Sequence, residues 1–222
     1  MVLNDKTRYL QIAFNYDIGM VRTILPKIPA SPRILIEAGT PFIKREGVNG
    51  IRYIRRIWKG MIVADIKIAD GAEDEVRMVY TAGANAVTVL GSAPKETLSK
   101  AVNVCKSFHV VCMADMLGVK DPLDVLRKLS ARPDVVVLHL GRDEEQTRGK
   151  LIQYRHVNRI RSKYPVLISA AGGVDIKRAR SAIFNGANIV VANIVQPGDG
   201  WRGISTEKDV GDMARKFLET IE

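Results

Sequence analysis

Two carboxylates and a lysine lie close together in the sequence, at Asp65, Lys67 and Asp70, directly after the apolar run Met61–Ala64. Side chains alternate along a strand, so Asp65 and Lys67 are expected to point to the same face of a strand that ends here. Neighbouring opposite charges keep each other ionised, and together they can ligate a hard cation and position a charged substrate. A purely structural ion pair is the alternative, but charges aimed into a core are costly to bury, which favours a functional site.

The segments that must position these residues alternate between short apolar runs and longer amphipathic stretches. Eight runs predict strands, at Tyr9–Phe14, Ile34–Glu37, Met61–Lys67, Ala86–Leu90, Val110–Ala114, Val135–His139, Val166–Ala170 and Ile189–Ala192. Amphipathic patterns predict helices that include Glu73–Thr81, Lys95–Lys106, Leu123–Leu129, Ile176–Phe184 and Glu207–Ile221. Eight strands separated by helices favour a closed (β/α)8 TIM barrel over an open sheet, and 222 residues suit a single α/β domain over 1–222.

Most of the predicted strands end in residues suited to a functional site. In a barrel of parallel strands, the chemistry gathers at the carboxyl ends of the strands. The residues found there are Asn15, Glu37, Asp65, Lys67, Asp115, His139 and the pair Gly172–Gly173. One polar strand end would mean little, but so many acidic, basic and imidazole groups at one rim predict an active site.

These residue types indicate metal-assisted proton chemistry. Glu37 and Asp65 offer the hard oxygen ligands that Mg²⁺ accepts, since this ion keeps several waters and needs only one or two carboxylates. A metal there could polarise a carbonyl and stabilise an enediolate. His139 is the only histidine at a predicted strand end, and its ordinary pKa suits proton transfer near neutrality; a hydrogen-bonded core histidine is the alternative.

The segment Ala170–Val174 contains a glycine pair between a strand and a helix. Glycine permits close approach of a ligand to the backbone, and a helix N-terminus favours anions, so Gly172 and Gly173 are candidates to bind a phosphate. A glycine pair alone is weak evidence for such a site.

At these residues the sequence resembles the orotidine 5'-monophosphate decarboxylase superfamily, particularly its branch of 3-hexulose-6-phosphate synthases and 3-keto-L-gulonate-6-phosphate decarboxylases. The resemblance runs through nearly the whole chain and is most specific at Glu37–Lys44, with its Glu-Ala-Gly-Thr-Pro motif, and at Ala64–Asp70, with its Asp-x-Lys-x-x-Asp motif. Further matches are Leu10–Phe14, Ala82–Ala84, Val87–Gly91, Asp115, Lys120–Pro122, His139, Gly141, Asp143 and Ala171–Gly173.

The resemblance implies a barrel that acts as a homodimer with shared active sites, in which Asp70 reaches into the site of the partner subunit. It implies Mg²⁺ near Glu37 and Asp65, Lys67 bonded to a sugar phosphate substrate, and proton handling by Asp115 and His139. In the synthase, His139 would take a proton from ribulose 5-phosphate, and the resulting enediolate would add to formaldehyde.

The branch assignment is mixed. Asp115 and Ala171 look like the synthase, whereas Arg142 looks like the decarboxylase, so decarboxylation of a 3-keto sugar phosphate is the alternative activity. The nucleotide decarboxylase itself, acting on orotidine 5'-monophosphate, is a less favoured alternative because it uses no metal. The predicted substrate-binding residues are Asn15, Arg142, Gly172, Gly173, Ala192 and Asn193.

The chain departs from the family pattern at several predicted substrate contacts. Asn15 replaces the usual aspartate, and the spacing from Asp143 to Gln146 is one residue longer than usual. Ala192 and Asn193 replace the glycine region that binds phosphate in the family. The following loop, Gln196–Trp201, carries Pro-Gly and Asp-Gly turn signals. It is expected to be another anion site with Arg202, a lid, or a surface turn with a partly buried tryptophan.

The net charge of +10 motivates an alternative hypothesis in which the protein is not an enzyme. It would then be a non-catalytic barrel that binds a phosphorylated ligand or RNA. However, the basic residues are spread along the chain and aromatic residues make up only 6%, which disfavours nucleic acid. The densest basic segment, Arg148–Lys163, has apolar residues at roughly helical spacing and predicts a solvated outer helix.

Little in the sequence suggests export or a membrane. The N-terminal residues are polar and charged, and no apolar run approaches the ~18 residues of a membrane span. Two cysteines, Cys105 and Cys112, give no disulfide framework. A cytoplasmic protein that contacts no membrane is therefore expected.

Overall fold

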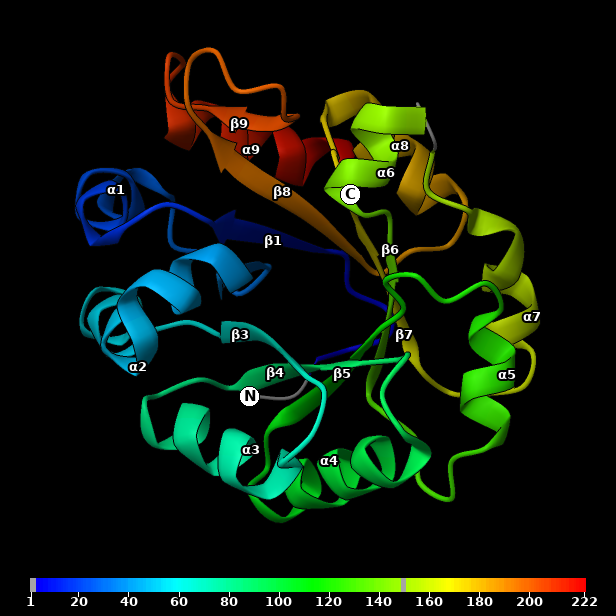
Figure 1. The fold of residues 1–222 in the computed structure, drawn as a ribbon. Helices are drawn as coiled ribbons and strands as arrows, with labels where there is room; N and C mark the ends of the chain where they lie inside the picture. The colour runs from blue at the N-terminus through cyan, green and yellow to red at the C-terminus, as the bar shows by residue number, and fades with distance from the viewer. Residues whose placement is uncertain (1–2, 149–150) are drawn as a thin grey trace.

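A computed structural model describes residues 3–148 and 151–222 and shows eight parallel strands closed into a barrel (Figure 1). Neighbouring strands along the chain pair in order, and the pairing of β1 with β8 closes the ring. The barrel strands are β1 (Tyr9–Phe14), β2 (Ile34–Ala38), β3 (Ile62–Ile68), β4 (Ala86–Leu90), β5 (Val111–Asp115), β6 (Val135–His139), β7 (Leu167–Ala171) and β8 (Ile189–Val195). The predicted (β/α)8 barrel is confirmed.

Helices surround the barrel on its outside (Figure 1). They are α1 (Ile18–Ile24), α2 (Thr40–Ile57), α3 (Ala72–Thr81), α4 (Lys95–Ser107), α5 (Pro122–Arg127), α6 (Arg142–Arg148), α7 (Val157–Arg161), α8 (Ile176–Phe184) and α9 (Val210–Thr220), with short 3-10 turns η1 (Leu25–Lys27) and η2 (Tyr154–His156). Aspartate side chains accept hydrogen bonds from backbone N–H groups in the first turns of α1, α5, α8 and α9, which fixes where these helices begin.

The core has two layers because side chains alternate across each strand. In β1, Leu10, Ile12 and Phe14 pack outward into the large apolar cluster shared with the helices. Tyr9 and Ala13 belong instead to the cluster inside the barrel. The interior therefore receives every second residue of a strand, which is how a polar residue near the carboxyl end comes to face the mouth of the barrel.

The predicted strands agree with the observed ones to within one residue at each end, except that β8 continues to Val195. Beyond it, a short ninth strand, β9 (Gly203–Ser205), pairs in parallel with Asn193–Val195. This addition was not predicted. Gly203 permits it, because a Cβ at this position would collide with the Asn193 carbonyl oxygen.

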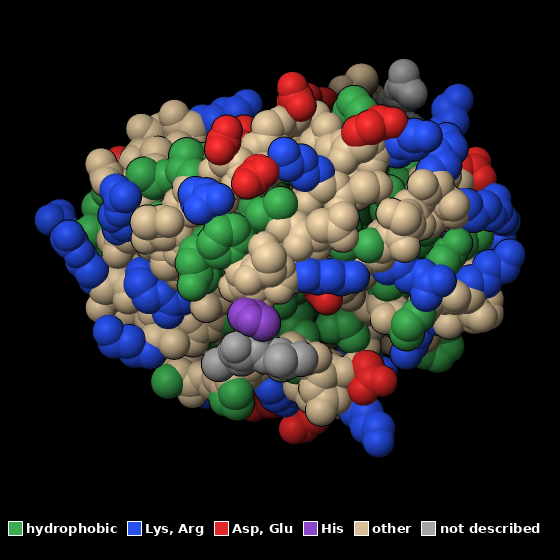
Figure 2. Space-filling view, turned by 90° about the horizontal axis from the view of Figure 1, so that it is seen from below, with side chains coloured by type: hydrophobic (Ala, Val, Ile, Leu, Met, Phe, Trp, Pro, Cys, Tyr) green, Lys and Arg blue, Asp and Glu red, His purple; other side chains and the backbone are tan. Residues whose placement is uncertain are grey.

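The outer helix predicted over Arg148–Lys163 is only partly observed. The turn η2 and helix α7 cover residues 154 to 161, and Lys150 lies outside the described residues. Figure 2 shows Lys and Arg side chains scattered over the face seen from below, without a continuous basic stripe there. Among the described helices, none has both the length and the apolar character that a membrane crossing would require.

Candidate active site

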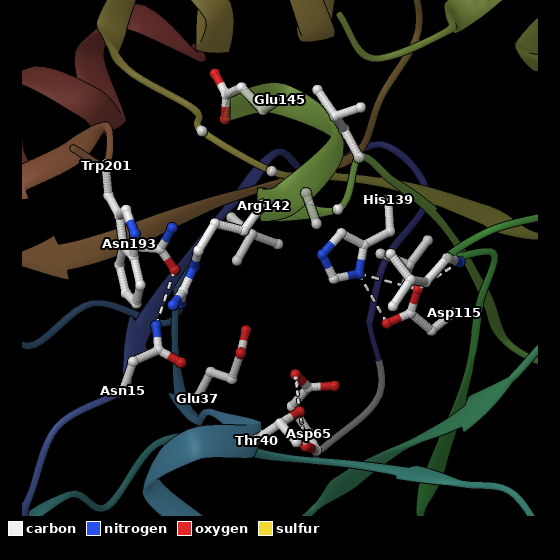
Figure 3. A pocket seen from close by; sticks show the side chains of 18 of the residues that line it. Asn15, Glu37, Thr40, Asp65, Asp115, His139, Arg142, Glu145, Asn193 and Trp201 are labelled. Atoms are coloured by element: carbon white, nitrogen blue, oxygen red, sulfur yellow. Dashed lines mark hydrogen bonds and ion pairs between the residues drawn. The ribbon is translucent and has the colours of Figure 1, made fainter. Parts of the chain in front are cut away.

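A cavity of about 310 Å³ opens at the carboxyl ends of the barrel strands (Figure 3). Ten of the twelve residues predicted for the site line it, namely Asn15, Glu37, Asp65, Lys67, Asp115, His139, Arg142, Gly172, Gly173 and Asn193. The other two lie elsewhere: Asp70 is exposed, and Ala192 is fully buried in the outer core cluster. The side chain of Ala192 therefore contacts no ligand in the cavity.

Lys67 connects two carboxylates on neighbouring walls of the cavity. Its Nζ donates to Asp65 Oδ1 and Oδ2 at 2.8 and 2.7 Å, and to Asp115 Oδ2 at 2.9 Å. Thr40 and Thr88 donate from their hydroxyls to the carboxylate of Asp65, each at 2.8 Å. The carboxylate of Asp65 is thus fixed by three donors, and the shared face predicted for Asp65 and Lys67 is confirmed.

An irregularity at the end of β3 sets the position of Lys67. The pairing of β3 with β4 shifts register between Ala64 and Ile68, and Lys67 has a φ of 53°. A side chain in this left-handed region costs about 1–2 kcal/mol. The Lys67 backbone N–H donates to Thr88 Oγ1 at 2.9 Å, and the two carboxylates bind its side chain, so the surrounding contacts offset this cost.

Asp115 also contacts His139. His139 Nδ1 lies 3.0 and 2.9 Å from Asp115 Oδ1 and Oδ2, and the Leu117 backbone N–H donates to Oδ1 at 3.0 Å. Figure 3 shows the second ring nitrogen of His139 facing the cavity, away from Asp115. The carboxylate therefore orients the imidazole with Nε2 toward the cavity.

The charges in this chain of contacts stabilise one another. Burial raises the pKa of Asp115, but His139 and Lys67 outweigh it and lower the pKa to about 2. Burial lowers the pKa of His139, yet Asp115 more than compensates, so this pKa lies above its ordinary value. Burial likewise opposes the charge of Lys67, whose pKa is nevertheless raised by Asp65 and Asp115. Lys67 is therefore a fixed cation at neutral pH.

Glu37 lies in a different electrostatic setting. Burial, together with the nearby charge of Asp65, raises its pKa to about 7. Gln11 Nε2 donates to Glu37 Oε2 at 2.5 Å, while Gln11 Oε1 is buried without a hydrogen-bond partner among the described residues. Figure 3 shows Glu37 and Asp65 both projecting into the cavity. Glu37 is a buried carboxylate whose negative charge is not fully compensated by the surrounding side chains.

These residues fit a divalent cation with hard-oxygen preference. Glu37 and Asp65 supply carboxylate oxygens, and a cation between them would relieve the burial cost that raises the pKa of Glu37. The described residues contain no cluster of three or more His, Cys, Asp or Glu side chains arranged to hold a metal. Two carboxylates with water in the remaining positions is the ligand set that suits Mg²⁺.

The wall opposite Asp115 is built from β1, β8 and the loop after β8. Asn15 Nδ2 donates to Asn193 Oδ1 at 3.0 Å, which joins the residue after β1 to β8. The guanidinium of Arg142, from α6, stacks on the ring of Trp201. Both Arg142 and Trp201 line the cavity, so the loop predicted as a lid, anion site or surface turn forms part of the cavity wall.

The loop after β8 is held by its own contacts. Asp199 accepts hydrogen bonds from the Tyr16 hydroxyl and from the Gln196 backbone N–H, the latter at 2.7 Å. The ring centroids of Tyr16 and Trp201 lie 6.3 Å apart. These contacts connect the loop to the segment after β1 and keep Trp201 beside Arg142.

The glycine pair adopts conformations that other residues avoid. Gly172 has a φ of 109°, and a Cβ there would collide with the Leu140 carbonyl oxygen; Gly173 has a φ of 54°. The carboxylate of Glu145 lies directly over Gly173 and binds Arg178. The glycine pair predicted to bind a phosphate therefore lines the cavity with bare backbone, and a carboxylate of the chain itself lies beside it.

Several residues that shape the site were not predicted from the sequence. Gln11 and Thr88 lie on the inward faces of β1 and β4, where strand alternation alone could have marked them. Thr40 stands in the Glu-Ala-Gly-Thr-Pro motif, but the motif alone does not indicate that this threonine bonds Asp65. Glu145 carries no comparable signal, because its place depends on how helix α6 folds over the barrel. Trp201 belongs to the loop predicted as an anion site, a lid or a surface turn, and it lines the cavity.

Comparison with known proteins supports the same family. The family model of orotidine 5'-phosphate decarboxylase / HUMPS matches residues 10–193. The chain is 38% identical over 216 residues to the bifunctional enzyme Fae/Hps of Methanothrix thermoacetophila, and 35% identical over 214 residues to that of Methanocaldococcus jannaschii. These matches cover 96% of this chain but 53% and 52% of the relatives, so the chain spans about half the length of the curated relatives it matches.

Solved structures with the same fold include two enzymes acting on sugar phosphates. A 3-hexulose-6-phosphate synthase from Salmonella typhimurium has a TM-score of 0.83 at 27% identity, covering 96% of this chain and 98% of that one. A 3-keto-L-gulonate-6-phosphate decarboxylase from Vibrio cholerae has a TM-score of 0.78 at 19% identity, covering 97% and 98%, and shows the fold alone. The barrel, its strand-end residues and these matches agree: the chain belongs to the orotidine 5'-phosphate decarboxylase / HUMPS family.

Proposed function

We propose that this chain is a Mg²⁺-dependent aldehyde-lyase of the 3-hexulose-6-phosphate synthase type, which joins formaldehyde to ribulose 5-phosphate through an enediolate. The observation that carries the proposal is the connected array Asp65–Lys67–Asp115–His139, which faces Glu37 across one cavity. The names of the Fae/Hps relatives and of the synthase from Salmonella typhimurium support the same reaction class.

The array suits removal of a proton next to a carbonyl. In the neutral form, His139 Nε2 can accept a proton from C1 of ribulose 5-phosphate, while Asp115 stabilises the imidazolium that forms. The electrons of the broken C–H bond become the enediolate, with negative charge on the C2 oxygen. Lys67 carries a fixed positive charge in the cavity wall and can hydrogen-bond this developing oxyanion.

The enediolate then forms the new carbon–carbon bond. Its C1 attacks the carbon of formaldehyde, and the proton held on His139 neutralises the alkoxide produced, so that a 3-hexulose 6-phosphate results and the histidine returns to its neutral form. Glu37 and Asp65 would hold Mg²⁺, which supplies Lewis-acid polarisation of the substrate oxygens when bound. Arg142, Trp201, Asn15 and Asn193 define the wall that orients the sugar.

The experiment is direct. Purified protein is incubated with Mg²⁺, ribulose 5-phosphate and formaldehyde, and formaldehyde consumption is followed with and without EDTA. Metal-dependent consumption that is lost in Lys67→Ala and kept in Lys59→Ala, which changes an exposed lysine, supports the proposal. Absence of consumption by folded, Mg²⁺-loaded protein would refute it.

A second candidate, decarboxylation of a 3-keto sugar phosphate, is favoured by one specific observation. The guanidinium of Arg142 lies in the cavity wall, stacked on Trp201, where it can bind a carboxylate or a departing CO₂. Both reactions would share the enediolate. Release of CO₂ from 3-keto-L-gulonate 6-phosphate, without consumption of formaldehyde in the first assay, would decide for this candidate.

We also propose that two chains form a dimer in which Asp70 completes the site of the partner. Asp70 is exposed two residues after β3, outside the residues that line the cavity of its own chain. The Asp-x-Lys-x-x-Asp motif places this carboxylate three residues after Lys67. A carboxylate supplied across a twofold interface is consistent with both facts.

A further inference from the structure

The carboxylate of Glu145 occupies the position beside the glycine pair where an anionic ligand would be expected. A Cβ added to Gly173 would collide with both carboxylate oxygens of Glu145, so the carboxylate lies against the bare backbone. Glu145, Gly172 and Gly173 all line the cavity. Figure 3 shows Glu145 on α6, on the side of the cavity away from Asp65 and Thr40.

Two arginines from different elements converge on this carboxylate. Arg178, in the first turn of α8, donates from Nη1 to Glu145 Oε1 and to the Gly173 carbonyl oxygen, the latter at 2.8 Å. Arg202, at the end of the loop after β8, has its Nε 3.7 Å from the same Oε1. An oxyanion beside Gly173 is therefore held from two sides.

The two arginines differ in how firmly they are fixed. The side chain of Arg178 is 19% exposed and is bound to the backbone, whereas that of Arg202 is 55% exposed. Asp175 contacts both elements: Oδ1 accepts from the Arg178 backbone N–H at 2.8 Å, and Oδ2 lies 3.2 Å from Arg202 Nη1. Asp175 therefore holds Arg202 near the glycine pair even when Glu145 is elsewhere.

The end of β8 gives a reason for this arrangement. Asn193 lies within β8, where its side chain accepts a hydrogen bond from Asn15, while Ala192 packs in the outer core cluster. Neither residue offers a bare glycine backbone to a phosphate. A phosphorylated substrate must find its charge-assisted hydrogen bonds in other parts of the rim, and Arg202 emerges from the loop that directly follows.

We propose that Arg178 and Arg202 are the phosphate-binding pair of this chain, and that Glu145 is an internal anion which the phosphate of the substrate displaces. The inference rests on the proposed function only in assuming a phosphorylated ligand. With Glu145 in place, the charges of the two arginines are balanced by Glu145 and Asp175. When Glu145 moves away, Asp175 is the carboxylate that still contacts the two arginines within the described part of the chain, and the resulting positive excess favours a phosphate dianion.

This exchange makes the site selective for phosphorylated sugars. An unphosphorylated sugar brings no charge to replace the carboxylate, so separating Glu145 from the arginines would leave them without an anion. A phosphate replaces the lost contacts with bidentate hydrogen bonds to guanidinium groups and with the backbone of the glycine pair. Glu145 thereby lowers the affinity for every ligand and lowers it least for a phosphate ester.

The test measures binding without turnover. Inorganic phosphate and ribulose 5-phosphate are titrated calorimetrically into wild-type protein and into Glu145→Gln, Arg202→Gln and Arg180→Gln variants, in the absence of formaldehyde. Arg180 is an exposed arginine on the same helix as Arg178 and serves as the control for loss of charge. Glu145→Asp, which withdraws the carboxylate by one methylene, is the second variant if Glu145→Gln does not fold.

We expect Glu145→Gln to bind both ligands about 10-fold more tightly and Arg202→Gln to bind them about 10-fold more weakly, the size of one charge-assisted hydrogen bond. Arg180→Gln should stay within about twofold of wild type, as expected for an exposed and screened charge. Unchanged affinities in both Glu145→Gln and Arg202→Gln would overturn the inference and leave a purely structural ion pair.

The outcome also separates this inference from the proposed function. Opposite shifts in the two variants, without any formaldehyde consumption by wild type, would support the phosphate pair and contradict the synthase. Metal-dependent consumption with the same KM for ribulose 5-phosphate in wild type, Glu145→Gln and Arg202→Gln would support the synthase and overturn the role of Glu145.

Discussion

His139 Nδ1 lies 2.9 Å from Asp115 Oδ2, and the same oxygen accepts a 2.9 Å hydrogen bond from Lys67 Nζ. One buried carboxylate, whose side chain is 2% exposed, thus contacts the candidate base and the candidate oxyanion-binding lysine together. This arrangement ties the protonation of His139 to the charge of Asp115, and it predicts how both activity and stability should depend on pH.

The first prediction concerns activity. Asp115 favours the imidazolium form of His139 and raises its pKa, and only the neutral ring can accept a proton. The value of kcat/KM should therefore increase as the pH rises through this raised pKa. In Asp115→Asn the stabilising charge is gone, so the increase should begin at lower pH, with kcat reduced by about 10²-fold or more. A pH profile with the same midpoint in both proteins would contradict the role given to Asp115.

The second prediction concerns stability against pH. The pKa of Asp115 is lowered to about 2, so its contribution is present above the ordinary value of 3.8 and is lost as the pH falls toward 2. The pKa of His139 is raised, so its contribution is present below the ordinary value of 6.5 and is lost as the pH rises through the folded-state pKa. The free energies of unfolding of wild type and Asp115→Asn, measured with urea, should therefore differ most between pH 3.8 and pH 6.5.

The difference in the free energy of unfolding between wild type and Asp115→Asn should become smaller at both low and high pH. A difference in the free energy of unfolding that stays constant across the whole range would show that Asp115 acts by packing alone. Thr23→Ala provides a comparison, because it removes a polar contact on the exposed surface of α1 that involves no titratable group.

The third prediction concerns Lys67. Its removal leaves Asp65 and Asp115 buried side by side without their cation, which typically costs about 3–5 kcal/mol. Lys67→Ala should therefore lower the free energy of unfolding at pH 7 by about this amount and abolish turnover, whereas Lys59→Ala changes neither. Full activity in a folded Lys67→Ala protein would show that Lys67 takes no part in the reaction.

The fourth prediction concerns metal binding. Because the pKa of Glu37 is raised to about 7 and a carboxylate must be ionised to ligate Mg²⁺, the affinity for Mg²⁺ should increase as the pH rises through this region. Binding at pH 6 should release protons, and titration calorimetry in two buffers of different ionisation enthalpy measures them. Glu37→Gln should lose at least about 10-fold in affinity and release no proton. Equal proton release by both proteins would place the metal elsewhere.

The fifth prediction tests the shared site. Lys67→Ala and Asp70→Ala should each be inactive alone. After the two variants are mixed and their subunits exchanged, about half of the dimers are mixed and each contains one intact site, which returns about a quarter of wild-type activity. No recovery, with subunit exchange verified by mass spectrometry, would show that Asp70 acts in its own chain or not at all.

Strand periodicity predicted most of the fold because the strands are covered on both faces. Continuous runs such as Val135–His139 have few other stable arrangements, and polar residues at their ends fall on one rim by geometry. The longest helix, α2, is not among the predicted helices, and it is kinked at Gly47, whose φ of 58° and ψ of −155° are not helical.

The parts of the site that escaped prediction depend on tertiary contacts. Nothing in the charged segment Arg142–Arg148 distinguishes Glu145 from its acidic neighbours until α6 is placed against α8. The sequence indicates the loop of Trp201 but not the ninth strand, β9, which pairs with β8 directly after this loop. By contrast, the spacing of Asp65 and Lys67 along a strand predicts that Lys67 belongs to the site. Its left-handed backbone has no signal in the sequence.

The most direct measurement follows the carbon of formaldehyde. Wild-type protein is mixed with Mg²⁺, ribulose 5-phosphate and ¹³C-formaldehyde, and the product is examined by ¹³C NMR, with His139→Ala as the control. The account predicts that the label becomes a hydroxymethyl carbon bonded to the former C1 of the pentulose, only with Mg²⁺ and only with His139. Label that remains as free formaldehyde, in folded and metal-loaded protein, would contradict it.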